Sequence, residues 1–192
     1  MIITSEKMIN ISKWGVTVIM FAISIAILAG PHTARAATNL LINPGFEDRW
    51  FTYNEAFEWQ NFGSGYERKK SAIHGGAWSI KITNNDSTKT AGAYQRVNLN
   101  QTTLKPVFIG GFVKGKNIVN SPGGFIAASI YAEIHLIDGT VVYWNSIANT
   151  GSFNWRWIGF NTATLANVNK PISHIFIVPN LSYATGIAYF DD

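Results

Sequence analysis

The segment 125–137, FIAASIYAEIHLI, constrains the fold more than any other because apolar residues occupy every second position along it. Side chains of a β-strand alternate between its two faces, so one face of this strand must belong to a core. That apolar face carries Ile126, Ala128, Ile130, Ala132, Ile134 and Leu136. The opposite face carries Ser129, Tyr131, Glu133 and His135. Asp138-Gly139 follows and precedes a second β-prone run at 140–147, which predicts a hairpin.

The rest of the chain after residue 36 also consists of short β-prone runs separated by clusters of Gly, Asn, Pro and Ser. Helical periodicity is almost absent, a pattern typical of an all-β sandwich. The chain has no cysteine and hence no disulfide, but an apolar core suffices at this size and a bound metal would add stability. We predict one domain with strands at 39–42, 57–62, 66–70, 77–83, 91–98, 107–114, 125–137, 140–147, 155–164, 172–178 and 186–190.

The N-terminal segment 1–36 has the order of features found in a secretory signal peptide. Two lysines, Lys7 and Lys13, precede the apolar run 16–29, and Ala34-Arg35-Ala36 supplies small residues for cleavage after Ala36. A membrane anchor is the alternative, but this run of about 14 residues is shorter than the roughly 20 that span a bilayer. We therefore predict an exported domain at 37–192, without stable membrane insertion after cleavage.

The predicted mature domain has 12 basic and 10 acidic side chains, so its charge is nearly balanced. Its one basic run, Arg68-Lys69-Lys70, is explained by a solvated strand end. We therefore predict no nucleic-acid partner.

The polar face of segment 125–137 combines aromatic and hydrogen-bonding side chains, which is what a carbohydrate site requires. Aromatic rings stack under the C–H faces of sugars, and amides or carboxylates bind the hydroxyls. On the partner run, Tyr143 and Asn145 lie on one side and Trp144 on the other. In NWRWIGF, Trp155 and Trp157 lie opposite the core-like Ile158 and Phe160. We predict carbohydrate-binding side chains at Tyr131, Glu133, His135, Trp144 and Trp157.

Catalytic patterns are weak by comparison. Glu133 and His135 lie two residues apart on one strand face and form a possible acid–base pair. A glycosidase needs two carboxylates across a cleft, and only Glu133 lies on the candidate face. The three histidines of the predicted mature domain have no metal-ligand spacing.

Acidic residues stand near both ends of the predicted domain: Glu47-Asp48 and Asp191-Asp192. If the terminal strands pair, these carboxylates converge, and calcium is the natural cation to hold them together. The alternative is that acids at chain ends are simply solvated.

Five motifs occur in order along the chain: NLLINPGFE, SAIHGGAWSIKIT, AGAYQRVNL, TGSFNWRWIGF and GIAYFDD. Together they resemble carbohydrate-binding modules of families 4, 9, 16 and 22, which occur beside catalytic domains in secreted bacterial glycanases. The resemblance implies a galactose-binding-like jelly roll that binds glycans without catalysis. It also implies a structural calcium, held by the side chains of Glu47 and Asp191 and by backbone oxygens near Asn43 and His74. The family pattern continues past FDD with an apolar stretch, so we expect either a shortened last strand or a longer protein.

The leading prediction is therefore a secreted polysaccharide-binding module at 37–192 that holds a covalently linked catalytic domain, or the cell, near its substrate. One alternative is a structural or adhesion spacer that binds no sugar. Another is a jelly-roll glycan lyase or hydrolase in which Glu133 and His135 meet a third polar partner. Three or more Trp or Tyr side chains lining one groove would favour glycan binding over the spacer.

Overall fold

The predicted hairpin is present. The computed structural model describes residues 38–124, 126–148 and 150–192, and the predicted signal peptide with its cleavage site lies outside this part of the chain. Strands β6 (Ala128–Leu136) and β7 (Val141–Ile147) pair antiparallel, with Tyr131 opposite Asn145. The turn between them is closed by the Gly139 amide, which donates to the Leu136 carbonyl at 3.1 Å. Gly139 has a φ of 87°, which explains the preference for glycine at this position.

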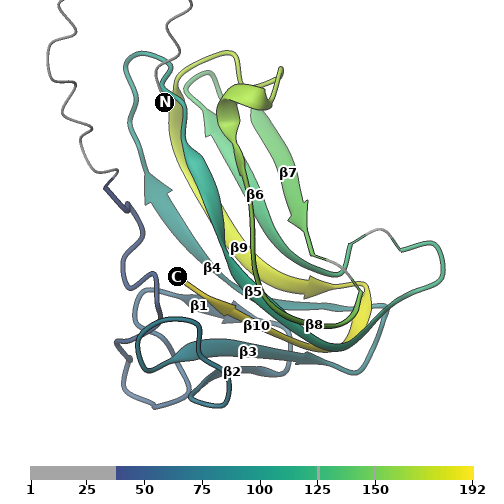
Figure 1. The fold of residues 1–192 in the computed structure, drawn as a ribbon. Coiled ribbons are helices and arrows are strands. Elements are labelled where there is room, and N and C mark those ends of the chain that lie inside the picture. Colours follow the sequence, from purple (N-terminus) through teal and green to yellow (C-terminus); the bar gives the residue numbers. More distant parts are fainter. Residues whose placement is uncertain (1–37, 125, 149) are drawn as a thin grey trace, which may run out of the picture. The chain divides into compact units, whose positions relative to one another are not determined.

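The strands form two antiparallel sheets that face each other as a sandwich (Figure 1). The first has the order β1-β4-β9-β6-β7 and adds β1 (Gln60–Phe62), β4 (Thr90–Asn98) and β9 (Ile172–Ser182) to the hairpin. The second has the order β2-β3-β10-β5-β8, with bounds Tyr66–Lys69, Ser79–Asn84, Ala184–Asp191, Phe108–Asn120 and Gly151–Asn161. The all-β jelly-roll sandwich predicted from the sequence is thus confirmed. No helix in the described residues is long and apolar enough to cross a membrane.

The core lies between the two sheets and is built as the alternation predicts. Ala128, Ile130, Ala132, Ile134 and Leu136 are all buried there, together with apolar side chains of the second sheet such as Val113 and Ile158. Ile126 was expected among them, but it precedes the first residue of β6 and is only partly buried. Ser129, on the opposite face, is also fully buried, and its hydroxyl is satisfied there by donating to the Asn180 side chain at 3.1 Å.

Segment 39–42, predicted as a strand, belongs to no strand of the structure. Ile42 instead exchanges two hydrogen bonds with the Gln95 side chain, one from its amide and one to its carbonyl, each 2.8 Å long. A side chain of β4 thus satisfies the backbone groups that a neighbouring strand would otherwise pair. Other boundaries also differ. Strand β1 is shorter than predicted, and Thr162–Thr164 forms a 3₁₀ turn after β8, which begins at Gly151. Strands β5 and β9 continue past the predicted ends at 114 and 178, to Asn120 and Ser182.

Candidate functional site

A groove of about 590 Å³ crosses the outer face of the first sheet, on the side away from the core. Its residues come from β1, β4, β6, β7 and β9 and from the segments that follow β5 and β9. Five of them are aromatic: Phe62, Tyr94, Tyr131, Phe176 and Tyr183. Five are polar or charged: Thr90, Glu133, Asn145, Asn180 and Ser182. Ile126 and Val178 complete the lining.

The rings of the groove support one another across strands. Tyr94 of β4 lies 6.1 Å from Phe176 of β9 and 6.4 Å from Phe62 of β1, measured between ring centroids. On the other side, Tyr131 stacks on the exposed Tyr143 of β7 at 6.2 Å, with nearly parallel planes. This arrangement holds the rings in place before any ligand binds, so less side-chain entropy is lost on binding.

Glu133 is the acidic centre of the groove. Its carboxylate accepts a hydrogen bond of 3.2 Å from the Tyr131 hydroxyl, and its other oxygen lies 3.7 Å from the His135 ring nitrogen Nε2. Burial, followed by the charge of Glu133, raises the pKa of Tyr131, so this phenol remains a hydrogen-bond donor at neutral pH. His135 stacks on His174 at 4.2 Å, and burial is the main cause of the lowered pKa of His174. Within the groove, the carboxylate of Glu133 is thus an acceptor for a polar ligand.

The structure brings only part of the predicted carbohydrate-binding set together. Tyr131 and Glu133 line the groove, and His135 follows them on the same face of β6. Trp144 points to the opposite side of β7, where its ring lies 6.2 Å from core Phe160. Trp157 belongs to β8 of the second sheet. The groove therefore contains only part of the predicted set, since alternation removes Trp144 and sheet membership removes Trp157. Sugar binding by these five side chains stays a prediction.

Sequence reasoning missed Tyr94, Phe176, Phe62 and Tyr183 as groove residues. Alternation in segments 91–98 and 172–178 puts Tyr94 on the face opposite to that of core Ala93, and Phe176 on the face opposite to that of core Ile175. The outward direction of both rings could therefore be predicted from the sequence. The order of strands could not be predicted, because β4 and β9 are far apart in sequence yet pair directly, with Gln95 opposite Ile177.

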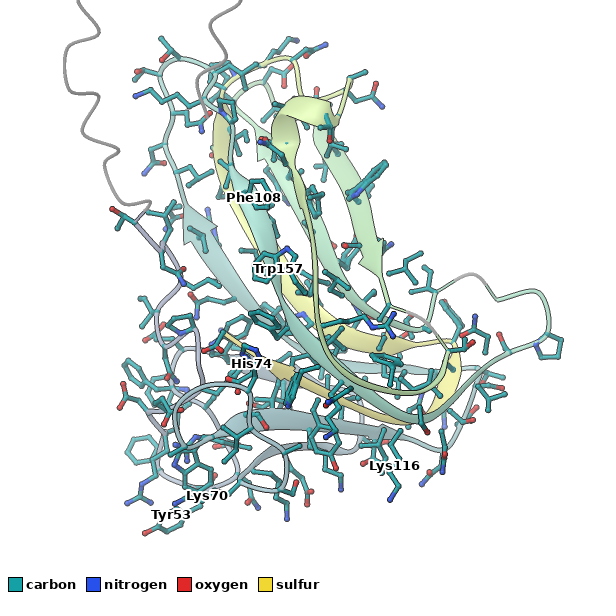
Figure 2. All side chains as sticks on the ribbon, viewed as in Figure 1. Tyr53, Lys70, His74, Phe108, Lys116 and Trp157 are labelled. Carbon is teal, nitrogen blue, oxygen red and sulfur yellow. The ribbon has the colours of Figure 1, made fainter. Side chains whose placement is uncertain are left out.

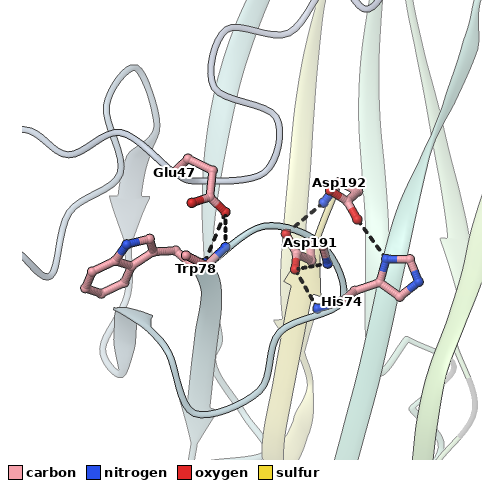
Figure 3. Close-up of polar contacts among 7 residues, drawn as sticks. Glu47, His74, Trp78, Asp191 and Asp192 are labelled. Atoms are coloured by element: carbon pink, nitrogen blue, oxygen red, sulfur yellow. Dashed lines mark hydrogen bonds and ion pairs between the residues drawn. The ribbon is translucent and has the colours of Figure 1, made fainter.

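The acids near both ends of the domain converge on the loop 74–78 (Figure 3). One Glu47 oxygen accepts hydrogen bonds from the amides of Ala77 (2.8 Å) and Trp78 (3.1 Å). One Asp191 oxygen accepts from the amides of His74 (2.8 Å) and Gly75 (3.1 Å). The proposed pairing of terminal strands is wrong, because β10 lies between β3 and β5 and segment 39–42 is not a strand. The loop, and not strand pairing, gathers the carboxylates.

Arg68 holds the turn that presents Glu47. It is 2% exposed, and it donates to the carbonyls of Phe46 (2.5 Å) and Glu47, with its guanidinium 3.7 Å from the Trp78 ring centroid. The interpretation of Arg68 as part of a solvated basic run is therefore wrong: a buried cation is tolerated here because carbonyl dipoles and an aromatic face replace water.

The residues expected to hold calcium fit that ion only in part. Carboxylate oxygens of Glu47 and Asp191 are suitable hard ligands, and burial raises the pKa of Asp191 to about 6. Asn43 does not fit, because its carbonyl accepts from the Phe46 amide and the Trp59 indole, and its side-chain oxygen accepts from the Asp48 amide. Across residues 38–192 except 125 and 149, no three His, Asp or Glu side chains form a group able to hold a metal ion.

Comparison with known proteins supports the fold. No family model and no curated protein matches the sequence. Among solved structures, a family 16 carbohydrate-binding module is 19% identical with a TM-score of 0.52, over 80% of this chain and 96% of the module. The tandem CBM22-1-CBM22-2 domain of Paenibacillus barcinonensis Xyn10C is 17% identical with a TM-score of 0.50, over 83% of this chain and 45% of that one. The enzymatically active domain of bacteriophage CBA120 tailspike protein 4 is 11% identical with a TM-score of 0.54, over 80% and 20%.

Proposed function

We propose that the domain is a non-catalytic polysaccharide-binding module whose ligand lies in the groove of the first sheet. The observation that carries the proposal is the lining of that groove: rings from β1, β4, β6, β9 and the segment after β9 lie among amide, hydroxyl and carboxylate groups. Three of the rings are tyrosines, which meets the sequence-based criterion that separates glycan binding from a spacer. Similarity of fold to carbohydrate-binding modules supports the same conclusion.

The chemistry of the groove matches that of a sugar chain. Tyr94 and Tyr131, from opposite sides of the groove, offer ring faces to the C–H surfaces of pyranose rings. Asn145, Asn180 and Glu133 provide acceptors, and the two amides also provide donors, for sugar hydroxyls. Aromatic area supplies most of the binding energy and the polar groups fix the orientation.

Replacing Tyr131 by Ala is expected to weaken polysaccharide binding about tenfold or more, as for a buried aromatic at the centre of an interface. The measurement is affinity gel electrophoresis against a panel of neutral polysaccharides, with Tyr94→Ala as a second groove variant. Tyr53→Ala is the matched control, because Tyr53 is exposed and does not line the groove. Equal retention of all three variants and the wild type would place the site elsewhere, and no retention of the wild type by any polysaccharide would favour the spacer.

A second candidate function is glycan cleavage, since Glu133 contacts a third polar partner, the hydroxyl of Tyr131, as well as approaching His135. The same polysaccharides, once bound, are assayed for new reducing or unsaturated ends. A chain that binds but never shortens its ligand removes this candidate. Turnover that disappears in Glu133→Gln while binding persists would establish it.

We propose further that the domain is exported, with cleavage after Ala36, and that it acts beside a covalently linked catalytic domain. The order of basic, apolar and small residues in segment 1–36 supports export. N-terminal sequencing of the secreted protein tests the cleavage site, because a first residue other than Ala37 contradicts it.

Calcium remains a proposal for the carboxylates of Glu47 and Asp191, with backbone oxygen from the loop at His74. Millimolar CaCl₂ is expected to raise the melting temperature by roughly 5–10 °C over a chelated sample, if the ion is present at about 100 times its Kd. Differential scanning calorimetry provides the measurement, and Glu47→Gln is expected to lose most of the rise. Identical melting temperatures with calcium and with chelator would contradict a structural ion.

A further inference from the structure

We propose that the domain has a second ligand surface, on the outer face of the second sheet, that binds an anionic polysaccharide independently of the groove. The surface joins two features: an aromatic platform formed by Phe108, Phe112, Trp155 and Trp157 on β5 and β8, and a lysine-lined hollow beside it. Figure 2 shows Phe108 and Trp157 on these strands, His74 of the loop 74–78 beyond Trp157, and Lys116 farther along β5.

Trp157 is built into the platform by two glycines. Gly110 and Gly159 are paired across β5 and β8. A Cβ added at Gly110 would meet the Trp157 ring at 2.4 Å, and one at Gly159 would meet the indole nitrogen at 3.1 Å. The indole therefore occupies the space above two missing side chains, close to the backbone, and 48% of the residue remains exposed. Phe108 continues the apolar surface and is 69% exposed.

The remaining rings brace this platform. Phe112 lies opposite Trp157 in the strand register, with 5.4 Å between ring centroids. His74 stacks on Phe112 at 3.5 Å and meets Trp155 edge-on at 5.7 Å. An indole held in one orientation with an exposed face is suited to stacking on a sugar ring, because little freedom is lost when a ligand covers it.

The positive charge of two lysines beside the platform determines which kind of polysaccharide fits this surface. Along β5, Lys114 and Lys116 follow Phe112 and line a hollow of about 500 Å³ with Tyr189, Ser152 and Asn154. Within the described residues neither lysine takes part in an ion pair. The nearby carboxylates of Asp191 and Asp192 are engaged by the amides of His74 and Gly75 and by the His74 ring. Two uncompensated ammonium groups next to an aromatic platform match a pyranose chain that carries carboxylate or sulfate groups.

The experiment compares polygalacturonate, dextran sulfate and a neutral xylan in affinity gels. Trp157→Ala, and the double variant Lys114→Gln/Lys116→Gln, are each expected to weaken retention by polygalacturonate about tenfold or more. Both should leave the neutral ligand of the groove unaffected, and Tyr131→Ala should leave polygalacturonate retention intact. Raising the salt concentration to about 1 M should also weaken the retention by polygalacturonate, since the Debye length falls to about 3 Å. Unfolding curves of each variant establish that the fold is retained.

Several outcomes would overturn the proposal. One is polygalacturonate retention that survives both platform variants, or that disappears with Tyr131→Ala. Another is retention that depends on the lysines and not on Trp157, which would mean charge attraction without stacking. A third is a dimer in sedimentation experiments that Trp157→Ala dissociates, which would make the platform a self-association surface. Loss of binding to the neutral polysaccharide alone would contradict the function proposed for the groove and would not contradict the second ligand surface.

Discussion

Gly65→Ala is expected to lower the free energy of unfolding by about 3 kcal/mol or more, within the range of the most damaging single substitutions. Gly65 has a φ of 87°, and a Cβ there would lie 2.0 Å from the backbone carbonyl oxygen of Thr83. The Thr83 amide also donates to the Gly65 carbonyl at 2.9 Å, where β2 and β3 begin to pair. Because β3 is held by β10 on its other side, its backbone cannot retreat without breaking a second set of strand contacts.

Urea denaturation measures this loss, and Gly139→Ala is the matched control. Gly139 has the same φ of 87°, but a Cβ there meets nothing within 4 Å. The control should cost only the backbone strain of a left-handed residue, about 1–2 kcal/mol. The difference between the two variants isolates the collision with β3. Equal losses would show that the contact with Thr83 relaxes freely.

Arg68→Ala is expected to lower the free energy of unfolding by about 2–4 kcal/mol, because it leaves one buried and one partly buried carbonyl acceptor without their charged donor. Those carbonyls belong to Phe46, which is 3% exposed, and to Glu47, whose side chain holds the loop 74–78. The variant should therefore also release Glu47 from the amides of Ala77 and Trp78. In a domain of this size each kcal/mol shifts the melting temperature by about 2–4 °C, so the loss is readily measured by calorimetry.

Lys69→Ala serves as the control for Arg68, since the Lys69 side chain is 43% exposed and its ion pair with Glu67 spans 3.5 Å. Its effect should stay within about 0.5 kcal/mol. Arg68→Lys separates charge from geometry, because an ammonium supplies charge without the planar fork that reaches two carbonyls. A loss below about 1 kcal/mol for Arg68→Ala would mean that water replaces the guanidinium.

The core face of β6 was predictable because alternation is a local property of a strand. From Ala128 to Leu136 every second side chain is buried, as the spacing indicates. Where the prediction failed, a side chain had replaced strand pairing, as Gln95 does for the backbone of Ile42. No local pattern in segment 39–42 reports a bond to a residue more than fifty positions later.

The groove shows the same difference between local alternation, which could be predicted, and the pairing of distant strands, which could not. Tyr131 and Glu133 were identified because they share one face of one strand, whereas Tyr94 and Phe176 join them through pairings between distant strands. Trp157 was correctly placed opposite the buried Ile158 and Phe160, but its outward face belongs to the other sheet. A strand's sequence therefore predicts which side chains point outward, and not which outward surface they share.

By itself, the sequence determined the all-β class, the hairpin at Asp138-Gly139, and the split of β6 into an apolar and a polar face, because these depend on neighbours within a few residues. Only the tertiary structure decided which strands lie side by side. That choice separated the groove of Tyr131 from the platform of Trp157, buried Arg68 beneath Trp78, and brought Glu47 and Asp191 to one loop. The physical reason is that strand order is set by burial summed over both sheets, a quantity that no single segment carries.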